Sequence, residues 1–206
     1  MPESIVVVAP HPLDYALLRP ATDLPKVPIK FLYLGRIEPE KGISLLLDAW
    51  TRIPNRNQHL TLMGTISASY KATLTKRLTS DPALRNVNVE AEVPPDQALH
   101  SIDSHHILVH PSRSENFGLA IAEAMCRGRP VITTTPTPWP EIQSRSAGWC
   151  VPPTPDALAT AIQAAASTSA RDLASIAANA RNWMQQSYSW EVLKGTYMSR
   201  IYDAPV

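Results

Sequence analysis

The sequence predicts a doubly wound α/β domain, in which a parallel β-sheet is covered by helices on both faces. Short apolar stretches alternate along the chain with longer stretches of helical periodicity. The short stretches are continuously apolar, as is typical of strands that are buried on both faces. Glycine and charged residues gather directly after these stretches, where the carboxyl ends of parallel strands meet and where ligands bind in this class of fold.

Six segments are predicted as strands. The first five are short apolar runs bounded by glycine, proline or polar residues, and the sixth is the run GWCVPP. The six segments are residues 29–35, 59–64, 86–93, 106–112, 129–134 and 148–153.

The segments between the strands predict helices. Residues 42–53 carry Leu45, Leu46, Ala49 and Ile53 at helical spacing. The chain has 20 prolines, roughly twice the number expected at the average usage of about 5%, and they gather in connections such as PTPWP and PPTP. Further helices are predicted over about residues 68–79, just before residue 106, over 118–128, over 155–167 and, as two or three helices, over about 171–203.

Composition excludes several classes of protein. A chain of 206 residues predicts one domain, or one domain with an appendage. The formal net charge of +1 offers no basic field for nucleic acid or anionic lipid. Cys126 and Cys150 are too few for a disulfide framework and do not have metal-ligand spacing.

The sequence also lacks the patterns of a membrane or secreted protein. The apolar run IVVVA near the first residue is short and follows an acidic residue, unlike a signal peptide. No run of about 18 apolar residues predicts a transmembrane segment. We therefore expect a cytoplasmic protein, with peripheral contact at the inner face of the membrane as an open alternative.

Two cations follow the first predicted strand in the segment LGRIEPEKG. Arg36 and Lys41 leave the carboxyl end of this strand together, and Gly35 allows a tight backbone there. Two cations on such a loop can hold a diphosphate, because a guanidinium binds phosphate in a fork geometry and an ammonium binds it as a point charge. The alternative is that both are solvated cations that pair with Glu38 and Glu40.

Two glutamates stand seven residues apart in the segment ENFGLAIAEAM. The predicted helix begins near Phe117 or Gly118, so its free N–H groups favour an anion, and Glu115 lies just upstream. Glu123 lies on the second turn of a helix that is otherwise almost entirely apolar. Its carboxylate either forms an exposed pair with Arg127 four residues later or accepts hydrogen bonds from the hydroxyls of a ligand.

The sequence lacks the motifs of several other kinds of binding or catalytic site. His106 and His110 lie about 13 Å apart on an extended strand and His105 faces the other side, so we expect all three to be packing or solvated residues and not metal ligands. No dinucleotide-binding glycine motif, phosphate-binding loop or nucleophile elbow occurs. No Asp-x-Asp occurs either, so nothing indicates a divalent metal that would bind a diphosphate.

Three segments together resemble a known family. FLYLGRIEPEKGISLLLDAW, LVHPSRSENFGLAIAEAMCRGRPVITTTPTPW and YSWE are similar to segments of the retaining glycosyltransferases of the group 1 (family 4) type, which have the GT-B fold. The resemblance runs from about residue 25 onward. The form with SENFG and a later TPW most resembles bacterial enzymes that build lipopolysaccharide, capsule or exopolysaccharide.

The resemblance implies a Rossmann-like domain that is the C-terminal, donor-binding half of a GT-B fold. By its motif, Arg36 and Lys41 hold the diphosphate of a nucleotide sugar and stabilise it as the leaving group. Glu115 contacts hydroxyls of the donor sugar, and Glu123 accepts hydrogen bonds from the ribose. No metal or other cofactor is implied. The remaining substrate-binding positions are Gly35, Asn116, Phe117, Gly118 and Leu119.

The resemblance also implies a domain division and a missing partner. Residues 1–24 resemble an inter-domain linker, residues 25–186 the nucleotide-sugar-binding domain, and residues 187–206 the C-terminal crossing helix. In the family, an N-terminal domain binds the acceptor, a saccharide or a lipid-linked molecule, and transfer proceeds with retention. We expect that half to come from a separately encoded chain or from a longer protein.

Several alternatives for function stay open. The donor nucleotide is UDP-, GDP- or ADP-linked, and we expect the isolated chain to transfer no sugar. A different class of function is a catalytically incomplete module or remnant that only binds a nucleotide sugar. A sugar-nucleotide epimerase of related fold is a third, weaker hypothesis, because the loop with Arg36 and Lys41 fits it less well.

Overall fold

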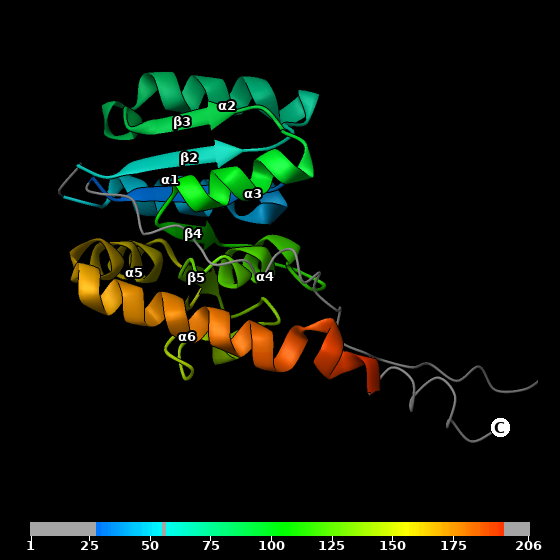
Figure 1. The fold of residues 1–206 in the computed structure, drawn as a ribbon. Helices are drawn as coiled ribbons and strands as arrows, with labels where there is room; N and C mark the ends of the chain where they lie inside the picture. Colours follow the sequence, from blue (N-terminus) through cyan, green and yellow to red (C-terminus); the bar gives the residue numbers. More distant parts are fainter. Residues whose placement is uncertain (1–27, 55–56, 196–206) are drawn as a thin grey trace, which may run out of the picture.

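A computed structural model describes residues 28–54 and 57–195, and the strands in these residues form one parallel sheet (Figure 1). Every neighbouring pair of strands in the sheet is parallel. The strand order is β3-β2-β1-β4-β5-β6. All six predicted strands are confirmed. They are β1 (Lys30–Leu34), β2 (His59–Met63), β3 (Val87–Glu90), β4 (Ile107–His110), β5 (Val131–Thr134) and β6 (Gly148–Val151).

The predicted helices are also present. Of the two or three helices expected over about residues 171–203, the described residues contain a 19-residue helix that ends at Tyr188 and, after an extended Ser189, a short helical stretch over residues 190–195. The long helix contains no glycine or proline, and the Ser169 hydroxyl accepts from the Asp172 N–H at its start. The helices are α1 (Ile43–Thr51), α2 (Ala68–Ser80), α3 (Pro95–Ser104), α4 (Leu119–Cys126), α5 (Pro155–Ser167) and α6 (Ala170–Tyr188), with 3₁₀ turns η2 (Pro39–Lys41), η3 (Pro82–Leu84) and η4 (Pro140–Ile142).

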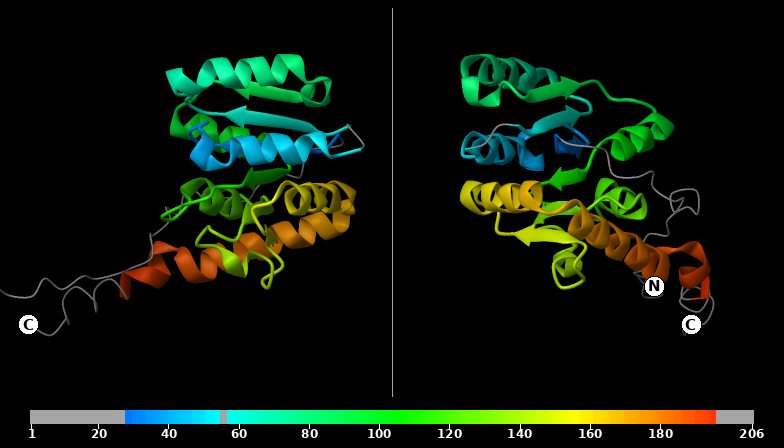
Figure 2. Two further views of the ribbon diagram at one scale, coloured as in Figure 1. Left: turned by 180° about the vertical axis from the view of Figure 1, so that it is seen from behind. Right: turned by 60° about the vertical axis from the view of Figure 1, so that its left-hand side comes forward.

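The helices cover the two faces of the sheet in two groups. Successive strand residues point to opposite faces, so Phe31 and Tyr33 pack in one core with α1, α2 and α5, while Leu32 packs in the other with α3, α4 and α6. Figure 1 shows the second group in front of the strands, and the view from behind in Figure 2 brings α1 and α5 forward. The expected doubly wound arrangement is confirmed.

The strand order creates a crevice between β1 and β4. From β1 the chain adds β2 and β3 on one side and then returns to place β4 on the other side of β1. The helices that follow β1 and β4 therefore lie on opposite faces of the sheet, and this point is where ligands bind in open α/β sheets. The two candidate segments of the sequence, residues 35–42 and 111–118, are the loops after these two strands.

The two loops are in contact at the crevice. The Arg113 N–H donates to the Glu40 carbonyl oxygen at 3.3 Å. Gly42 has a φ of 76°, and a Cβ at this position would lie 2.0 Å from the Pro111 carbonyl oxygen. Only glycine therefore permits this close approach, which ties the turn that carries Lys41 to the loop after β4.

The expected domain division stays a prediction. Residues 1–24, expected to be a linker, lie outside the described residues, as do residues 196–206 at the other end. The helical path does break at Ser189, two residues after the point where a crossing segment is expected to begin.

Candidate functional site

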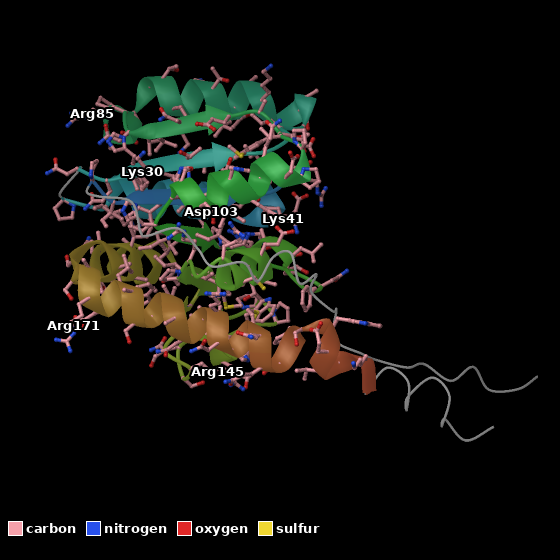
Figure 3. All side chains as sticks on the ribbon, in the orientation of Figure 1. Lys30, Lys41, Arg85, Asp103, Arg145 and Arg171 are labelled. Carbon is pink, nitrogen blue, oxygen red and sulfur yellow. The ribbon has the colours of Figure 1, made fainter. Side chains whose placement is uncertain are left out.

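The crevice joins a cation from one loop to a carboxylate from the other. Lys41 ends the turn η2, and its Nζ lies 2.9 Å from Oε2 of Glu115, which follows β4. Both side chains are largely buried, with 17% and 16% of their surface exposed. The ion partner of Lys41 is therefore Glu115 and not Glu38 or Glu40, as the surface-pairing alternative would have it. In Figure 3 Lys41 lies at the arrowhead end of the strands, with Lys30 and Arg85 at the other end.

His110, the last residue of β4, contacts the same carboxylate. Its Nε2 lies 3.1 Å from Glu115 Oε2, and its ring stacks on Tyr33 with the ring centres 5.7 Å apart and an angle of 10° between the planes. The hydrogen bond from His110 is the main factor that lowers the pKa of Glu115, to about 2. Burial of the carboxyl opposes this shift, and Lys41 adds to it. Glu115 is thus held ionised at the crevice.

His110 is buried and packs on Tyr33, as a packing residue would, but its hydrogen bond to Glu115 was not expected from the sequence. The other two histidines of this segment do have structural partners: His106 Nδ1 accepts from the Lys30 N–H at 3.0 Å, and His105 bonds the Ser101 carbonyl and the Thr61 hydroxyl. His110 differs because it stands at the carboxyl end of its strand. That position in the sequence was the available signal, since side chains there face the crevice of a parallel sheet.

Arg36 stands at the rim of the crevice, outside the Lys41–Glu115 contact. Its side chain is 60% exposed and pairs with Glu38 at 3.2 Å, so for this residue the surface pair expected as an alternative is present. Its backbone is held by a hydrogen bond, because the hydroxyl of the buried Tyr33 donates to the Arg36 carbonyl oxygen at 2.5 Å. Burial, with the nearby charge of Glu115, raises the pKa of Tyr33, so the phenol keeps its proton for this bond.

The turn between Glu115 and α4 is tightly packed. Gly118 caps the helix with a φ of 79°, and a Cβ there would lie 3.2 Å from Cγ of Glu115 and 3.1 Å from Cδ1 of Ile121. The expected helix start near Gly118 is confirmed, and Leu119 in the first turn is 48% exposed. The free N–H groups of α4 begin directly after the crevice carboxylate.

An aromatic cluster supports this turn from behind. The indole of the buried Trp139 donates to the Phe117 carbonyl oxygen, and its ring packs against Phe117. The same indole contacts Trp183 and Tyr188 of α6. In the sequence, the TPW motif is informative only as part of the family resemblance. In the structure Trp139 connects α6 to the backbone of the candidate site.

Glu123 has an environment unlike that of Glu115. Burial raises the pKa of Glu123, and its carboxylate makes no hydrogen bond or ion pair with any residue that the structure describes. Arg127 instead binds Asp103 of α3 through two hydrogen bonds, one of them 2.9 Å long. The expected alternative of an exposed Glu123–Arg127 pair is wrong, because the nearby helix offers Arg127 a carboxylate with fork geometry.

Two open hollows continue the crevice toward the edge of the sheet. One, of about 430 Å³, lies at the carboxyl ends of β2 and β3, and the other, of about 320 Å³, lies beside η2. Both hollows lie at the carboxyl edge of the sheet, beside the loops that follow β1, β2 and β3. The first is lined by Gly64, Thr65, Ile66, Lys71, Val89, Glu90, Ala91 and Glu92, and the second by Glu38, Pro39, Glu40, Ser67, Ser69 and Tyr70.

Comparison with known proteins places the chain in a family. Residues 14–183 match the family described as "Glycosyl transferases group 1", and the chain belongs to it. It is 30% identical over 169 residues to O-antigen chain mannosyltransferase B of Escherichia coli. This match covers 78% of this chain and 42% of that protein. It is also 31% identical over 147 residues to D-inositol 3-phosphate glycosyltransferase of Frankia alni. This match covers 64% of this chain and 36% of that protein. The chain thus spans less than half the length of these relatives.

Solved structures with the GT-B fold match the architecture. Sucrose-phosphate synthase from Thermosynechococcus elongatus superposes with a TM-score of 0.80 and 25% identity, over 95% of this chain and 52% of that one. HepE of Anabaena in complex with UDP and glucose gives a TM-score of 0.73 and 20% identity, over 84% of this chain and 48% of that one. The C-terminal domain of LpcC from Francisella tularensis gives 0.72 and 20%, over 86% of this chain and 98% of that domain.

The described helices were also compared with the requirements of a membrane span. In residues 28–54 and 57–195, no helix combines the length and the apolar character that crossing a membrane demands.

Proposed function

We propose that this chain binds a nucleotide-diphosphate sugar and forms the donor half of a retaining glycosyltransferase. The observation that carries the proposal is the meeting of Lys41 and Glu115, from two loops, at the crevice between β1 and β4. Ligands of doubly wound sheets bind at this point. The UDP and glucose in the HepE structure and the family of the chain support a nucleotide sugar as the ligand.

In this proposal the cations act on the diphosphate. Lys41 is held at the crevice by Glu115, and Arg36 stands at its rim with an exposed guanidinium. As the glycosyl bond breaks, negative charge grows on the departing diphosphate. The cations at the crevice and the N–H groups at the start of α4 stabilise that charge, so the proposal includes no metal.

The glutamates act on hydroxyl groups. Glu115 is ionised and accepts hydrogen bonds from the donor sugar. Glu123 is partly buried without a hydrogen-bond donor among the described residues, and a carboxylate in that state is stabilised by the hydroxyls of a ribose. The backbone of the turn between them approaches the sugar and the phosphates. Its residues, with the glycine after β1, are Gly35, Asn116, Phe117, Gly118 and Leu119.

The remaining parts of the proposal concern the acceptor. The match over nearly all of the C-terminal domain of LpcC supports a donor-binding domain that acts together with an acceptor-binding domain. The E. coli relative, named for the O-antigen chain, supports a polysaccharide or lipid-linked acceptor of bacterial type. We propose that the reaction occurs in the cytoplasm or at the inner face of the membrane.

A nucleotide titration tests the proposal. By calorimetry with UDP, GDP and ADP we expect one nucleotide to bind, and Arg36→Ala or Lys41→Ala to weaken it at least tenfold, because a charge-assisted phosphate contact contributes about 1.5 to 3 kcal/mol. Arg85→Ala is the matched control, since it removes an exposed cation at the opposite end of the strands (Figure 3). The proposal is wrong if the wild-type chain binds none of the three nucleotides.

A second candidate function is a module that binds the nucleotide sugar without catalysis. The groups of the candidate site, Lys41, Glu115 and Glu123, are all ones that would contact a donor, and such groups can bind a nucleotide sugar without transferring it. We expect the isolated chain to bind the nucleotide but to transfer no labelled sugar to saccharide or lipid acceptors. Transfer that appears only on addition of an N-terminal GT-B half would favour the enzyme over the module, and transfer by the isolated chain would show that no second half is needed.

A further inference from the structure

The two oxygens of the Glu115 carboxylate have unequal surroundings. Lys41 Nζ at 2.9 Å and His110 Nε2 at 3.1 Å both contact Oε2. Oε1 makes no hydrogen bond with any residue in the described part of the chain. A carboxylate that is fixed through one oxygen cannot turn freely, so Oε1 keeps a defined direction and its full capacity to accept hydrogen bonds.

The protonation pattern of His110 follows from this contact. An ionised carboxylate only accepts hydrogen bonds, so Nε2 of His110 carries a proton and donates a hydrogen bond to Glu115. Nδ1 is buried and has no hydrogen-bond partner among the described residues. A buried polar atom without a partner is an exception in folded proteins and calls for an explanation. The ring is kept in place by its stack on Tyr33.

The two partners of Glu115 are not equivalent once a phosphate is present. The ammonium of Lys41 is carried on a flexible four-carbon stem and would be drawn toward a diphosphate, which carries more negative charge than one carboxylate. His110 is a rigid ring on a central strand, with 5% of its side chain exposed, and it has no such competing partner. If Lys41 were the only partner, Glu115 would lose its orientation at the moment of ligand binding.

We infer that His110 is a positioning residue for the sugar end of the site: it holds Oε2 of Glu115 so that Oε1 accepts from a hydroxyl of the donor sugar while Lys41 turns to the diphosphate. This inference rests on the proposed function. It gives separate tasks to the two contacts of one carboxylate. It also gives a reason for the buried, unpartnered Nδ1, since the ring is oriented for Glu115 and not for its own hydrogen bonding.

Two substitutions separate the hydrogen bond from the packing. His110→Phe keeps a ring on Tyr33 and removes the donor to Glu115, while His110→Gln restores an N–H donor at a similar reach without the ring. His105→Gln is the matched control, because it changes a histidine before the amino end of β4. Thermal unfolding is measured for each variant to show that it folds.

The first readout is the ratio of affinities for a nucleotide sugar and its nucleotide, measured with UDP-glucose against UDP and with GDP-mannose against GDP. We expect His110→Phe to weaken the sugar nucleotide about tenfold, as for loss of one oriented hydrogen bond, and the free nucleotide less than about twofold. His110→Gln should recover most of the loss, and His105→Gln should change neither. Equal losses for sugar nucleotide and nucleotide, or no loss, would overturn the inference.

The second readout needs no ligand and therefore separates this inference from the proposed function. The carboxyl carbon of Glu115 is followed by NMR as the pH falls from 7 to about 4, a range in which the wild-type group stays ionised. Besides His110, the charged and titratable groups near it are Lys41 and Tyr33, and Tyr33 is in turn near Arg36, Glu38 and Glu40. These groups are unchanged in every variant.

We expect Glu115 of His110→Phe to begin to take up a proton within this range, and Glu115 of His110→Gln to resist it. An unchanged titration in His110→Phe would overturn the inference, because His110 would then not hold Glu115. If the wild-type chain binds no nucleotide, the proposed function and the sugar-directed role fail together, and the titration still decides the contact itself.

Discussion

Glu115 and Glu123 belong to the same short segment, yet the fold gives them opposite surroundings. Glu115 lies on the loop and contacts groups from β4 and from η2, and these lower its pKa to about 2. Glu123 lies two turns along on α4, where burial raises its pKa and none of the described residues bonds to it. One carboxylate is therefore arranged by the protein before any ligand binds, and the other is left for a ligand to satisfy.

The difference suggests two separate roles for the two glutamates of one motif. A carboxylate with fixed partners is ionised and oriented, so it can accept from a sugar hydroxyl with little reorganisation. A partly buried carboxylate without partners destabilises the free protein, and it regains that free energy when a ligand donates hydrogen bonds to it. The four predictions below test this contrast, from the largest expected effect to the smallest.

Removal of the support between the two glutamates should have the largest effect. Trp139→Ala empties the centre of an aromatic cluster and removes the donor to the Phe117 carbonyl, so we expect the free energy of unfolding to fall by about 3 to 5 kcal/mol. Trp190→Ala, at a tryptophan that is 51% exposed, should change it far less. Chemical denaturation measures both. A similar loss in the two variants would contradict the role of Trp139 as a support.

Neutralising each glutamate should move stability in opposite directions. At pH 7 we expect Glu115→Gln to lower the free energy of unfolding by about 1 kcal/mol, because an ion pair and a charged hydrogen bond are lost at a partly solvated site. Glu123→Gln removes a partly buried charge and should leave stability unchanged or raise it by up to about 1 kcal/mol. Urea unfolding checks both signs, and the same sign for both variants would break the contrast.

The pH dependence of stability should show the same contrast. The folded pKa of Glu115, about 2, lies below its unfolded value of about 4.3, so its contribution is fully present above about pH 5 and is lost as the pH falls toward 2. The raised pKa of Glu123 works the other way, and stability recovers as the pH falls through that value. The stability difference between wild type and Glu115→Gln should therefore shrink between pH 5 and about 3. A constant difference would show that Glu115 is not held ionised.

The smallest effect is expected for the pair that the structure does not form. A double-mutant cycle between Glu123 and Arg127 should give a coupling energy below about 0.3 kcal/mol, whereas a cycle between Asp103 and Arg127 should give about 1 kcal/mol or more. Alanine substitutions and urea unfolding supply both cycles. A coupling of Glu123 to Arg127 as large as that of Asp103 would restore the surface-pair interpretation.

Much of the fold could be predicted because its signals are local. Each strand is one apolar run and each helix one periodic segment, and the runs continue for as long as the element does. The two or three helices expected near the end of the chain begin with α6, which contains no glycine or proline, and continue with a short helical stretch after Ser189. The loops that carry Arg36, Lys41 and Glu115 were also predictable, because a parallel sheet places such loops at its carboxyl edge.

The partners of the side chains were less predictable. The sequence suggests only a packing or solvated role for His110, yet its ring forms a hydrogen bond with the carboxylate of Glu115. Helical spacing offers Arg127 as one possible partner of Glu123, but Arg127 binds Asp103 on a different helix. A spacing rule describes neighbours on one element, but it contains no information on the residues that a neighbouring element brings closer.

By itself the sequence determined the order of strands and helices and the positions of two polar loops along the chain, since both depend on the residues nearest in sequence. Only the tertiary structure decided that Lys41 meets Glu115, 74 residues later, and that His110 shares the same oxygen. The reason is physical: the return of the chain from β3 to β4 sets β1 and β4 side by side, and that packing of the whole sheet selects which charges face each other.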